Sequence, residues 1–261
     1  MRAGPVEQGL VVDRVDLVYA TSRGALTALQ DLSLSVGPQE FVSVLGPSGC
    51  GKSSLLKLAS GLLAPTAGHV RLSGVPVLKP RSDVGIVFQQ ATLLPWKTVL
   101  DNVLVPIRAM KLPVPAYRQR AEELLALAGL AKFMHHYPRE LSGGMQQRVA
   151  LARGLIHDPK LLLMDEPFSA LDAMTREYMM DELQRIWLET RKAVLFITHS
   201  IPEAVYLSDR IIVMSGRPGR VVEQIDVGMA RPRTQADLGS PRFIDLCKHL
   251  RDRFRAAGMQ A

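Results

Sequence analysis

The sequence is poor in cysteine: Cys50 and Cys247 are the only two among 261 residues. Two thiols cannot form the disulfide framework of a small secreted domain. Cys50 also lies in a glycine-rich stretch, where a disulfide would block the approach of a ligand. This pattern fits a reducing compartment, the cytoplasm, better than an oxidising one.

Long apolar runs are also missing. Apolar runs such as Leu161 to Met164 and Val194 to Ile197 are far shorter than the roughly 20 residues that cross a bilayer. The segment Met1 to Glu7 has no continuous apolar stretch behind its basic residue, so we expect no secretory signal. Because 47% of the residues are apolar, the chain can still fill the core of one large or two modest domains.

Aromatic residues make up only 5% of the chain, and their scarcity limits what its net charge of +7 can mean. The basic excess is local, near the C-terminus: Arg242, Lys248, Arg251, Arg253 and Arg255. Only Phe243 and Phe254 lie among these residues, too few for a platform on which bases stack, so we expect no nucleic-acid partner. We interpret the segment as a solvated helix face, with weak attraction to anionic lipid headgroups as the alternative.

One stretch organises the rest of the chain. The apolar run Phe41 to Leu45 leads into Gly46-Pro47-Ser48-Gly49-Cys50-Gly51-Lys52-Ser53, and Ser54 to Ala59 can continue as a helix. This is the strand, glycine-rich loop and helix of a phosphate-binding loop. Glycines let successive N–H groups turn toward phosphate oxygens, with the positive end of the helix dipole behind them. We expect Lys52 to reach the β- and γ-phosphates and Ser53 to hold Mg²⁺.

Polar side chains follow three further buried strands. Val84 to Phe88 ends at Gln89, Leu161 to Met164 ends at Asp165 and Glu166, and Ala193 to Thr198 ends at His199. Parallel strands present their carboxyl ends at one edge of an α/β sheet, where ligands bind. Adjacent carboxylates are costly unless a cation offsets their charge, so we expect Asp165 to coordinate Mg²⁺ and Glu166 to direct a water molecule.

The segments on either side of these strands differ in character. Leu10 to Tyr19 and Leu29 to Val36 predict an antiparallel strand pair, in which Tyr19 is either a plain edge-strand aromatic or a surface for adenine stacking. Helices are predicted for Val99 to Met110, Ala116 to Ala128 and Gly144 to Leu155, broken by prolines 113, 115 and 138. Ser142 and two glycines before the last helix form a second anion-binding helix start or a simple structural cap.

Taken together, these motifs resemble the nucleotide-binding subunit of ATP-binding cassette (ABC) transporters, from about Val11 to Glu223. The signature of that family is matched by Leu141-Ser142-Gly143-Gly144-Met145-Gln146. The resemblance implies an α/β fold: a phosphate-loop NTPase core, RecA-like with a mainly parallel sheet, an N-terminal antiparallel β region and an inserted α-helical subdomain. We expect an ATPase domain over 6–230, with its core at 6–90 and 156–230 and its helical subdomain at 91–155, followed by a short helical tail at 231–261.

The resemblance also assigns roles to single residues. It makes Glu166, His199, Lys52 and Gln89 catalytic, with His199 contacting the γ-phosphate, and Ser53, Gln89 and Asp165 ligands of Mg²⁺. The nucleotide-binding set it implies is Tyr19, Gly46, Pro47, Ser48, Gly49, Cys50, Gly51, Lys52, Ser53, Ser54, Ser142, Gly143, Gly144, Gln146 and Asp172. Position 54 is Ser where many members have Thr, and position 200 is Ser where many have Asp.

The implied assembly is a head-to-tail dimer in which Ser142 of one copy completes the ATP site of the other. The resemblance further implies membrane-spanning permease subunits, a solute-binding protein acting with them, and a peripheral position on the cytoplasmic face of the cell membrane. Leu93 to Trp96, Arg217 to Arg220 and Arg231 to Arg233 look like the nitrate, sulfonate and taurine importer group, with kinship to carriers of vitamin precursors. The alternative is a soluble ABC ATPase without a transport role.

Overall fold

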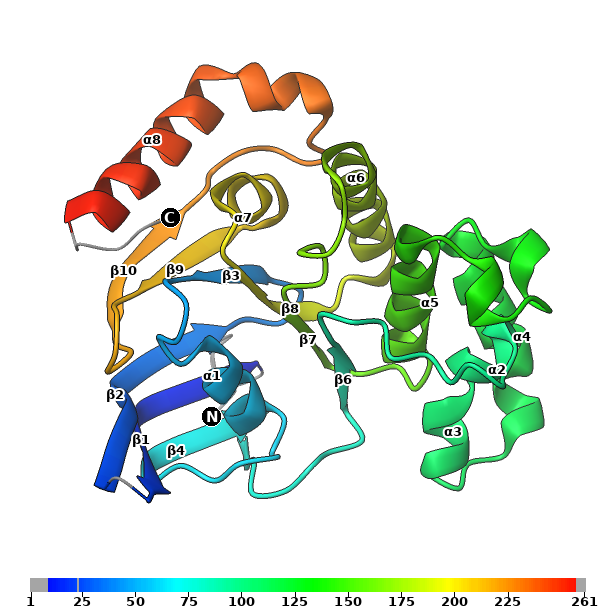
Figure 1. Ribbon diagram of the computed structural model, residues 1–261, viewed down its shortest axis with the longest axis horizontal. Coiled ribbons are helices and arrows are strands. Elements are labelled where there is room, and N and C mark those ends of the chain that lie inside the picture. The colour runs from blue at the N-terminus through cyan, green and yellow to red at the C-terminus, as the bar shows by residue number, and fades with distance from the viewer. Residues whose placement is uncertain (1–8, 23, 257–261) are drawn as a thin grey trace, which may run out of the picture. The chain divides into compact units, whose positions relative to one another are not determined.

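The computed structural model describes residues 9–22 and 24–256, so the expectation for the segment Met1 to Glu7 lies outside the described residues. The chain divides into two compact units (Figure 1). Of the described residues, the first combines 9–22 and 24–81 with 191–256, and the second is Ser82–Thr190. Among the described residues, no helix combines the length and the apolar character that a membrane crossing requires.

The first unit is built on strands β3 (Phe41–Leu45), β8 (Ala193–Thr198), β9 (Arg210–Met214) and β10 (Val221–Asp226). β3 lies between β8 and β9 and runs parallel to both, whereas β10 pairs antiparallel with β9. β3 and β8 are buried along their whole length, which explains why both read as unbroken apolar runs. The last residue of β3 pairs with Thr198 on one side and Val213 on the other, so three strands end at the same edge.

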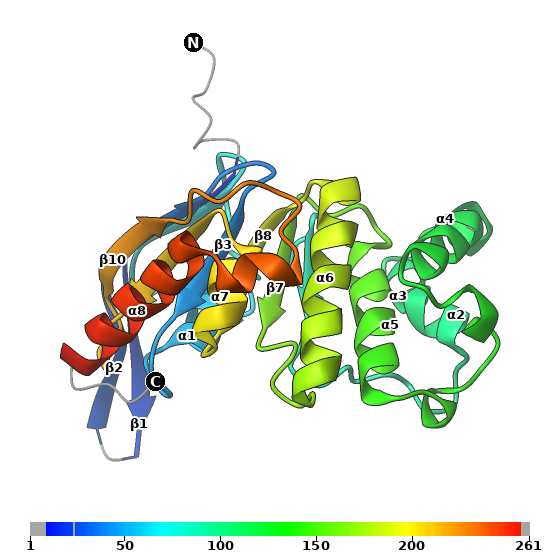
Figure 2. The same ribbon diagram turned by 90° about the horizontal axis from the view of Figure 1, so that it is seen from above.

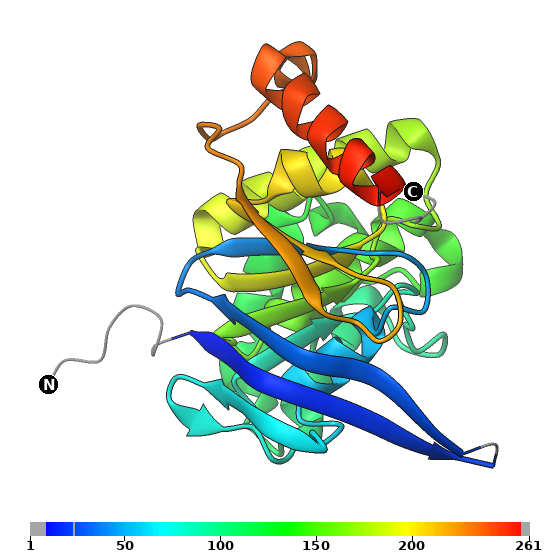
Figure 3. The same ribbon diagram turned by 90° about the vertical axis from the view of Figure 1, so that its left-hand side faces the viewer.

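An antiparallel sheet completes the strands of the first unit, and Figure 3 shows its long hairpin of β1 (Leu10–Thr21) and β2 (Gly24–Val36). β4 (Ala67–Leu72) pairs with β1, and β5 (Val75–Pro76) pairs with β4. The predicted N-terminal strand pair is thereby confirmed, and both strands extend beyond the predicted bounds. The helices of this unit are α1 (Lys52–Ala59), α7 (Ile201–Leu207) and α8 (Pro241–Ala256), with the 3-10 turn η4 (Gln235–Gly239) before α8.

Helix α8 packs its apolar side on its own unit, where Phe243, Leu246 and Leu250 are buried. Figure 2 shows α8 lying across α7. Its basic residues are exposed, in agreement with the expected helix face, and two of them bind neighbouring groups. Arg253 pairs with Glu223 at 2.7 Å, and Arg242 donates to the carbonyl of Val227 at 3.1 Å.

The second unit contains the parallel pair β6 (Val84–Val87) and β7 (Leu161–Asp165). Figure 2 shows α5 (Gly143–Leu155) between α6 (Ala173–Thr190) and the group of α2 (Val99–Val103), α3 (Val105–Ala109) and α4 (Val114–Leu127). Short 3-10 turns, η2 (Ala131–Phe133) and η3 (Pro138–Glu140), connect α4 to α5. A Cβ on Gly85 would come within 2.2 Å of the carbonyl oxygen of Gly154, so α5 and β6 approach backbone to backbone.

The helix predictions for this unit need two corrections. The single helix predicted for Val99 to Met110 is two helices that meet at Leu104. The reason is Pro106, which has no N–H to continue the hydrogen-bond ladder. The next helix begins at Val114 and holds Pro115 within its first turn, a position where proline is tolerated because those N–H groups lack helical partners anyway.

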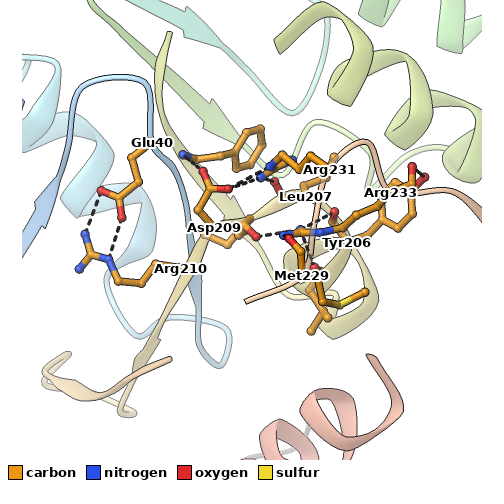
Figure 4. Close-up of polar contacts among 12 residues, drawn as sticks. Glu40, Tyr206, Leu207, Asp209, Arg210, Met229, Arg231 and Arg233 are labelled. Atoms are coloured by element: carbon orange, nitrogen blue, oxygen red, sulfur yellow. Dashed lines mark hydrogen bonds and ion pairs between the residues drawn. The ribbon is translucent and has the colours of Figure 1, made fainter. Parts of the chain in front are cut away.

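A buried polar network holds the end of α7 in the first unit (Figure 4). Arg233 is only 3% exposed, and its guanidinium donates to the carbonyls of Val205, Tyr206 and Ser208 at 2.8–3.0 Å. Burial lowers the pKa of Arg233 to about 10, so the group remains charged near neutrality. A cation at the C-terminal end of a helix also complements the helix dipole. Arg233 therefore closes helix α7 and ties the segment before α8 to it.

We expect the substitution Arg233→Met to lower the free energy of unfolding by about 3 kcal/mol, because several buried carbonyls lose their donor at once. Chemical denaturation of the full chain measures this loss. Arg251→Met, the same change on the exposed side of α8, is the matched control and should shift stability by less than about 0.5 kcal/mol. Equal stability of the two variants would contradict the role given to Arg233.

Candidate functional site

The predicted phosphate loop follows β3 and leads directly into α1. Gly49 and Gly51 adopt the left-handed region, with φ of 76° and 103°, as the glycines of such a loop must. Gly51 is the N-cap of α1 and supplies no side-chain hydrogen bond to the helix. No side chain of Gly51 therefore caps the first-turn N–H groups of α1, and groups of this kind can bind an anion.

Lys52 places a cation inside this loop. Its side chain is 6% exposed, and its ammonium donates to the carbonyl oxygens of Gly46 at 2.6 Å and Pro47 at 3.0 Å. The ammonium therefore lies against the backbone of the loop rather than in solvent. These contacts place a positive charge next to the N-terminal end of α1, and both features favour a negatively charged group there.

Cys50 is part of the packing under the loop. Its side chain is 1% exposed, and a Cβ on Gly46 would come within 2.7 Å of its sulfur. Burial raises the pKa of the Cys50 thiol, although Lys52 acts in the opposite direction. Cys50 therefore serves as a small apolar residue that supports the loop from inside.

Tyr19 lies on β1 next to the same loop and helix. Its hydroxyl and the hydroxyl of Ser54 are 3.0 Å apart and share a hydrogen bond. The ring is half-buried, so part of it remains available for a contact outside the chain. Tyr19 therefore lies beside the first turn of α1, a position that agrees with both interpretations that the sequence leaves open.

His199 follows β8, the strand directly beside β3. Its side chain is exposed, and the residues around it are tightly organised. The hydroxyl of Thr198 donates to the buried carboxylate of Glu203 at 2.6 Å and accepts from the N–H of Ser200 at 3.0 Å. In the first unit, therefore, the phosphate loop and His199 leave the sheet from neighbouring strands at one edge, and the backbone on both sides of His199 is fixed.

The second unit brings Gln89 and the two carboxylates to one edge of its own strand pair. Val87 pairs with Met164, so Gln89 comes shortly after one strand, and Asp165 ends the other with Glu166 directly after it. Glu166 has a φ of 44°, a strained conformation for a residue with a side chain. Its carbonyl accepts from the N–H of Ser169 at 3.2 Å and from the hydroxyl of that serine at 2.9 Å. The turn after β7 thus fixes the backbone from which the Glu166 carboxylate projects.

Ser142 is the N-cap of helix α5, where its hydroxyl accepts from the N–H of Met145 at 3.3 Å. Ser142 and Gly143 are exposed, whereas Gly144 is buried because a Cβ there would come within 2.8 Å of Thr175 on α6. Gln146 donates to the carbonyls of Pro138 and Leu141, at 3.0 and 3.3 Å, and so holds the turn before the serine. Ser142 therefore caps α5, while Ser142 and Gly143 remain exposed at the start of the helix.

Asp172 forms the N-terminal cap of α6. Its carboxylate accepts from the N–H of Thr175 at 3.0 Å and from the hydroxyl at 2.7 Å, and these bonds lower the pKa of Asp172. A cavity of about 310 Å³ opens beside Ser142, between α5 and α6. Its lining is Ser142, Gly144, Met145, Arg148, Met174, Thr175, Tyr178 and Met179.

Two residues that the sequence did not single out hold the segment around Gln89. Gln147 is 5% exposed and donates to the carbonyl of Phe88 at 3.0 Å. Arg153 donates to the carbonyls of Ala91 at 2.6 Å and Thr92 at 2.9 Å. Both belong to α5, so the helix that begins after Ser142 binds the chain on both sides of Gln89. The sequence shows a polar amide and a guanidinium on one helix, but it does not show that their partners are the backbone carbonyls around Gln89.

Comparisons with known proteins agree with this geometry. The family model described as ABC transporter matches residues 29–169. The taurine import ATP-binding protein TauB of Burkholderia thailandensis is 50% identical over 242 residues, which cover 91% of this chain and 93% of that protein. The nitrate import ATP-binding protein NrtD of Synechococcus elongatus is 44% identical, covering 90% of this chain and 87% of that protein.

A solved structure is similar over most of the chain as well. The dimeric structure of a post-hydrolysis state of the ATP-binding cassette MJ0796, bound to ADP and Pi, matches with a TM-score of 0.72 and 34% identity. The match covers 85% of this chain and 100% of that one. The predicted α/β phosphate-loop fold is thereby confirmed.

Proposed function

The chain belongs to the ABC transporter family, and from this premise we propose that it is the ATP-hydrolysing subunit of an importer for a small solute. The observation that carries the proposal is the phosphate loop after β3, where Lys52 and the uncapped start of α1 meet. The import proteins TauB and NrtD align with about nine tenths of this chain, which supports the direction of transport.

We propose that the first unit binds the nucleotide. Backbone N–H groups of the loop and of the first turn of α1 surround the phosphates. They belong to Gly46, Ser48, Gly49, Cys50, Gly51, Lys52, Ser53 and Ser54, and Pro47 is part of the loop but has no N–H. Lys52 neutralises charge on the β- and γ-phosphates, and Tyr19 stacks on the adenine ring.

The donor atoms proposed for Mg²⁺ are the hydroxyl of Ser53, the carboxylate of Asp165 and the amide oxygen of Gln89. All three are hard oxygen ligands, the type that Mg²⁺ prefers alongside phosphate oxygens and water. Among the described residues, no cluster of three or more His, Cys, Asp or Glu side chains forms a metal cage. Three oxygen donors of this kind leave the remaining positions around the ion to phosphate oxygens and water. Bound there, Mg²⁺ would neutralise charge on the phosphates.

Hydrolysis then depends on positioning and on charge. We propose that the Glu166 carboxylate orients and polarises the attacking water molecule, and that His199 contacts the γ-phosphate. The fixed turns at both residues support these roles, because a positioned group contributes more than a mobile one.

We propose further that two copies of the chain form a head-to-tail dimer. Ser142, Gly143, Gly144 and Gln146 of one copy would cover the nucleotide bound by the other, with Asp172 near the same interface. The exposed edge at Ser142 and Gly143 supports this arrangement, and so does the dimeric state of the ADP-bound cassette MJ0796.

The permease is expected to dock on the helical part of the second unit. A cavity of about 360 Å³ is present there, lined by Thr98, Leu100, Asp101, Leu104, Arg108, Val114, Pro115, Arg118 and His135. Trp96, just before this stretch, is 71% exposed, which a buried core tryptophan would not be. An exposed aromatic two residues before Thr98, which lines this cavity, suits contact with a short helix of a membrane protein.

We expect Trp96→Cys to cross-link to a cysteine in a cytoplasmic loop of the permease in the assembled complex, because the side chain lies on the proposed docking face. Leu78→Cys is the matched control: Leu78 is 77% exposed but belongs to the first unit. Band shifts on a non-reducing gel measure the reaction. Equal cross-linking of both variants, or none at position 96, would argue against this docking face.

The solute is proposed to be a small sulfonate or nitrate-like anion, with a vitamin-precursor-like molecule as the second class. We also propose that the chain lies on the cytoplasmic face of the membrane as a peripheral subunit, and that a solute-binding protein acts with the permease.

The test is co-purification with a multi-span membrane protein, followed by ATP hydrolysis in proteoliposomes with and without taurine or nitrate on the binding-protein side. Hydrolysis without any membrane partner in the purified complex would instead indicate a soluble ABC ATPase.

A further inference from the structure

The turn between β9 and β10, residues 215–220, lies against the phosphate loop. β9 runs parallel to β3 on the side opposite to β8, and Leu45 pairs with Val213. The chain after β9 therefore leaves the sheet at the same edge as the phosphate loop. In α/β proteins this edge holds the groups that act on the ligand. The turn carries two arginines, Arg217 and Arg220, which the proposed function leaves without a role.

Arg217 is bound directly to the loop. Its guanidinium donates to the carbonyl oxygen of Gly49 from Nε at 3.3 Å and from a terminal nitrogen at 3.2 Å. Gly49 has a φ of 76°, one of several backbone conformations open to glycine, so these bonds select the direction in which its carbonyl points. The neighbouring N–H groups are those expected to face phosphate. Because Arg217 holds the carbonyl of Gly49, we expect the N–H groups next to it in the loop to keep a fixed direction as well.

Gly219 makes a second contact, on the backbone of the loop. A Cβ at this position would lie 2.0 Å from the carbonyl oxygen of Cys50, so only glycine fits. The peptide of Gly219 is itself held by β2: its N–H donates to Ala28 at 2.9 Å, and its carbonyl accepts from Gln30 at 3.0 Å. The turn is thus wedged between the antiparallel hairpin and the phosphate loop.

Ser215 stiffens the turn from within. Its hydroxyl donates to the carbonyls of Gly216 and Pro218 at 3.0 Å and accepts from the N–H of Arg220 at 2.9 Å. Arg220 directs its own guanidinium to Gln30, away from the loop. The two arginines of one turn therefore differ: Arg217 contacts the phosphate loop, and Arg220 contacts the hairpin.

We propose that Arg217 and Gly219 are positioning residues that hold the phosphate loop in its nucleotide-binding conformation. The consequence for ATP rests on the proposed function, whereas the consequence for the loop itself does not. Arg217→Gln removes the cation and its paired donors at an exposed position, so the fold should persist. Arg217→Lys keeps the charge but offers no planar pair of donors, and should give an intermediate result. Arg220→Gln is the matched control.

The first measurement uses Cys50 as a reporter of loop opening. The purified chain is treated with N-ethylmaleimide, and labelling of the two buried thiols is followed by mass spectrometry. We expect Arg217→Gln to label Cys50 about five times faster than the wild type, with Cys247 unchanged as the internal control. Arg220→Gln should match the wild type at both thiols. An unchanged Cys50 rate in Arg217→Gln would overturn the proposal.

The second measurement is ATP affinity and turnover. Arg217→Gln should raise the KM for ATP about fivefold with a smaller change in kcat, a split that a general loss of stability would not produce. Gly219→Ala should raise the KM for ATP more than tenfold, because the added Cβ displaces the Cys50 peptide.

Two outcomes would contradict parts of this account. If Cys50 labelling rises while the KM for ATP stays constant, the turn holds the loop but nucleotide binding does not depend on it, and the proposal is overturned. If the wild type binds no ATP, the proposed function fails, and the labelling contrast still decides the role of the turn.

Discussion

Replacing Glu166 with glutamine should slow ATP hydrolysis by at least about a hundredfold while leaving ATP binding intact. The amide has the shape of the carboxylate but cannot draw a proton from water. The hydrogen bonds that hold this turn come from Ser169 to the backbone carbonyl of Glu166, so the substitution leaves them in place. A loss of turnover with unchanged ATP affinity would therefore indicate that the charge of the carboxylate is needed for hydrolysis.

The same variant should accumulate as an ATP-bound dimer, since hydrolysis is the step that lets the two copies separate. Gel filtration with ATP and Mg²⁺ measures the dimer, and phosphate release measures the rate. Glu189→Gln is the control: the same chemical change in the same unit, at an exposed position near the end of α6. A variant at position 166 that hydrolyses ATP at the wild-type rate would remove Glu166 from its proposed role.

The substitution Lys52→Ala should weaken ATP binding by about two orders of magnitude or more. It removes the charge proposed to meet the β- and γ-phosphates, and charge-assisted hydrogen bonds of this kind contribute about 1.5–3 kcal/mol each. It also removes the donor that joins the carbonyls of Gly46 and Pro47, so the loop loses an internal contact. Both effects lower the affinity for ATP.

Calorimetric titration with ATP measures this loss, and circular dichroism verifies that the variant is folded. Lys57→Ala is the matched control, because Lys57 belongs to the same helix and is exposed. It should bind ATP as the wild type does. Retained micromolar binding by a folded Lys52→Ala protein would exclude the loop as the nucleotide site.

Much of this arrangement could be predicted from the sequence, because it is encoded locally. A buried strand is an apolar run, and the residue after it is polar where the strand ends at a ligand edge. Leu45, Met164 and Thr198 all end strands in the structure, or precede the last residue of one, as predicted. The glycine-rich loop was predictable for the same reason, since Gly51 needs a conformation that other residues avoid.

The contacts that support the site were not predictable, because their partners lie far apart in the chain. Arg217 reaches Gly49 across 168 positions, and Gln147 reaches Phe88 across 59. The charge or amide of such a residue is visible in the sequence, but its partner is a backbone carbonyl, which every residue has. The break at Leu104 was missed for a different reason: the apolar spacing continues through Pro106, and only the missing N–H interrupts the helix.

The hydrogen bonds from α5 to the chain around Gln89 also matter for how this segment can move. Gln147 and Arg153 bind the carbonyls of residues 88, 91 and 92, and both belong to the helix that Ser142 caps. This segment and Ser142 are therefore connected through one helix, α5. We therefore expect a displacement of residues 88, 91 and 92 to move α5 and, with it, the helix start at Ser142.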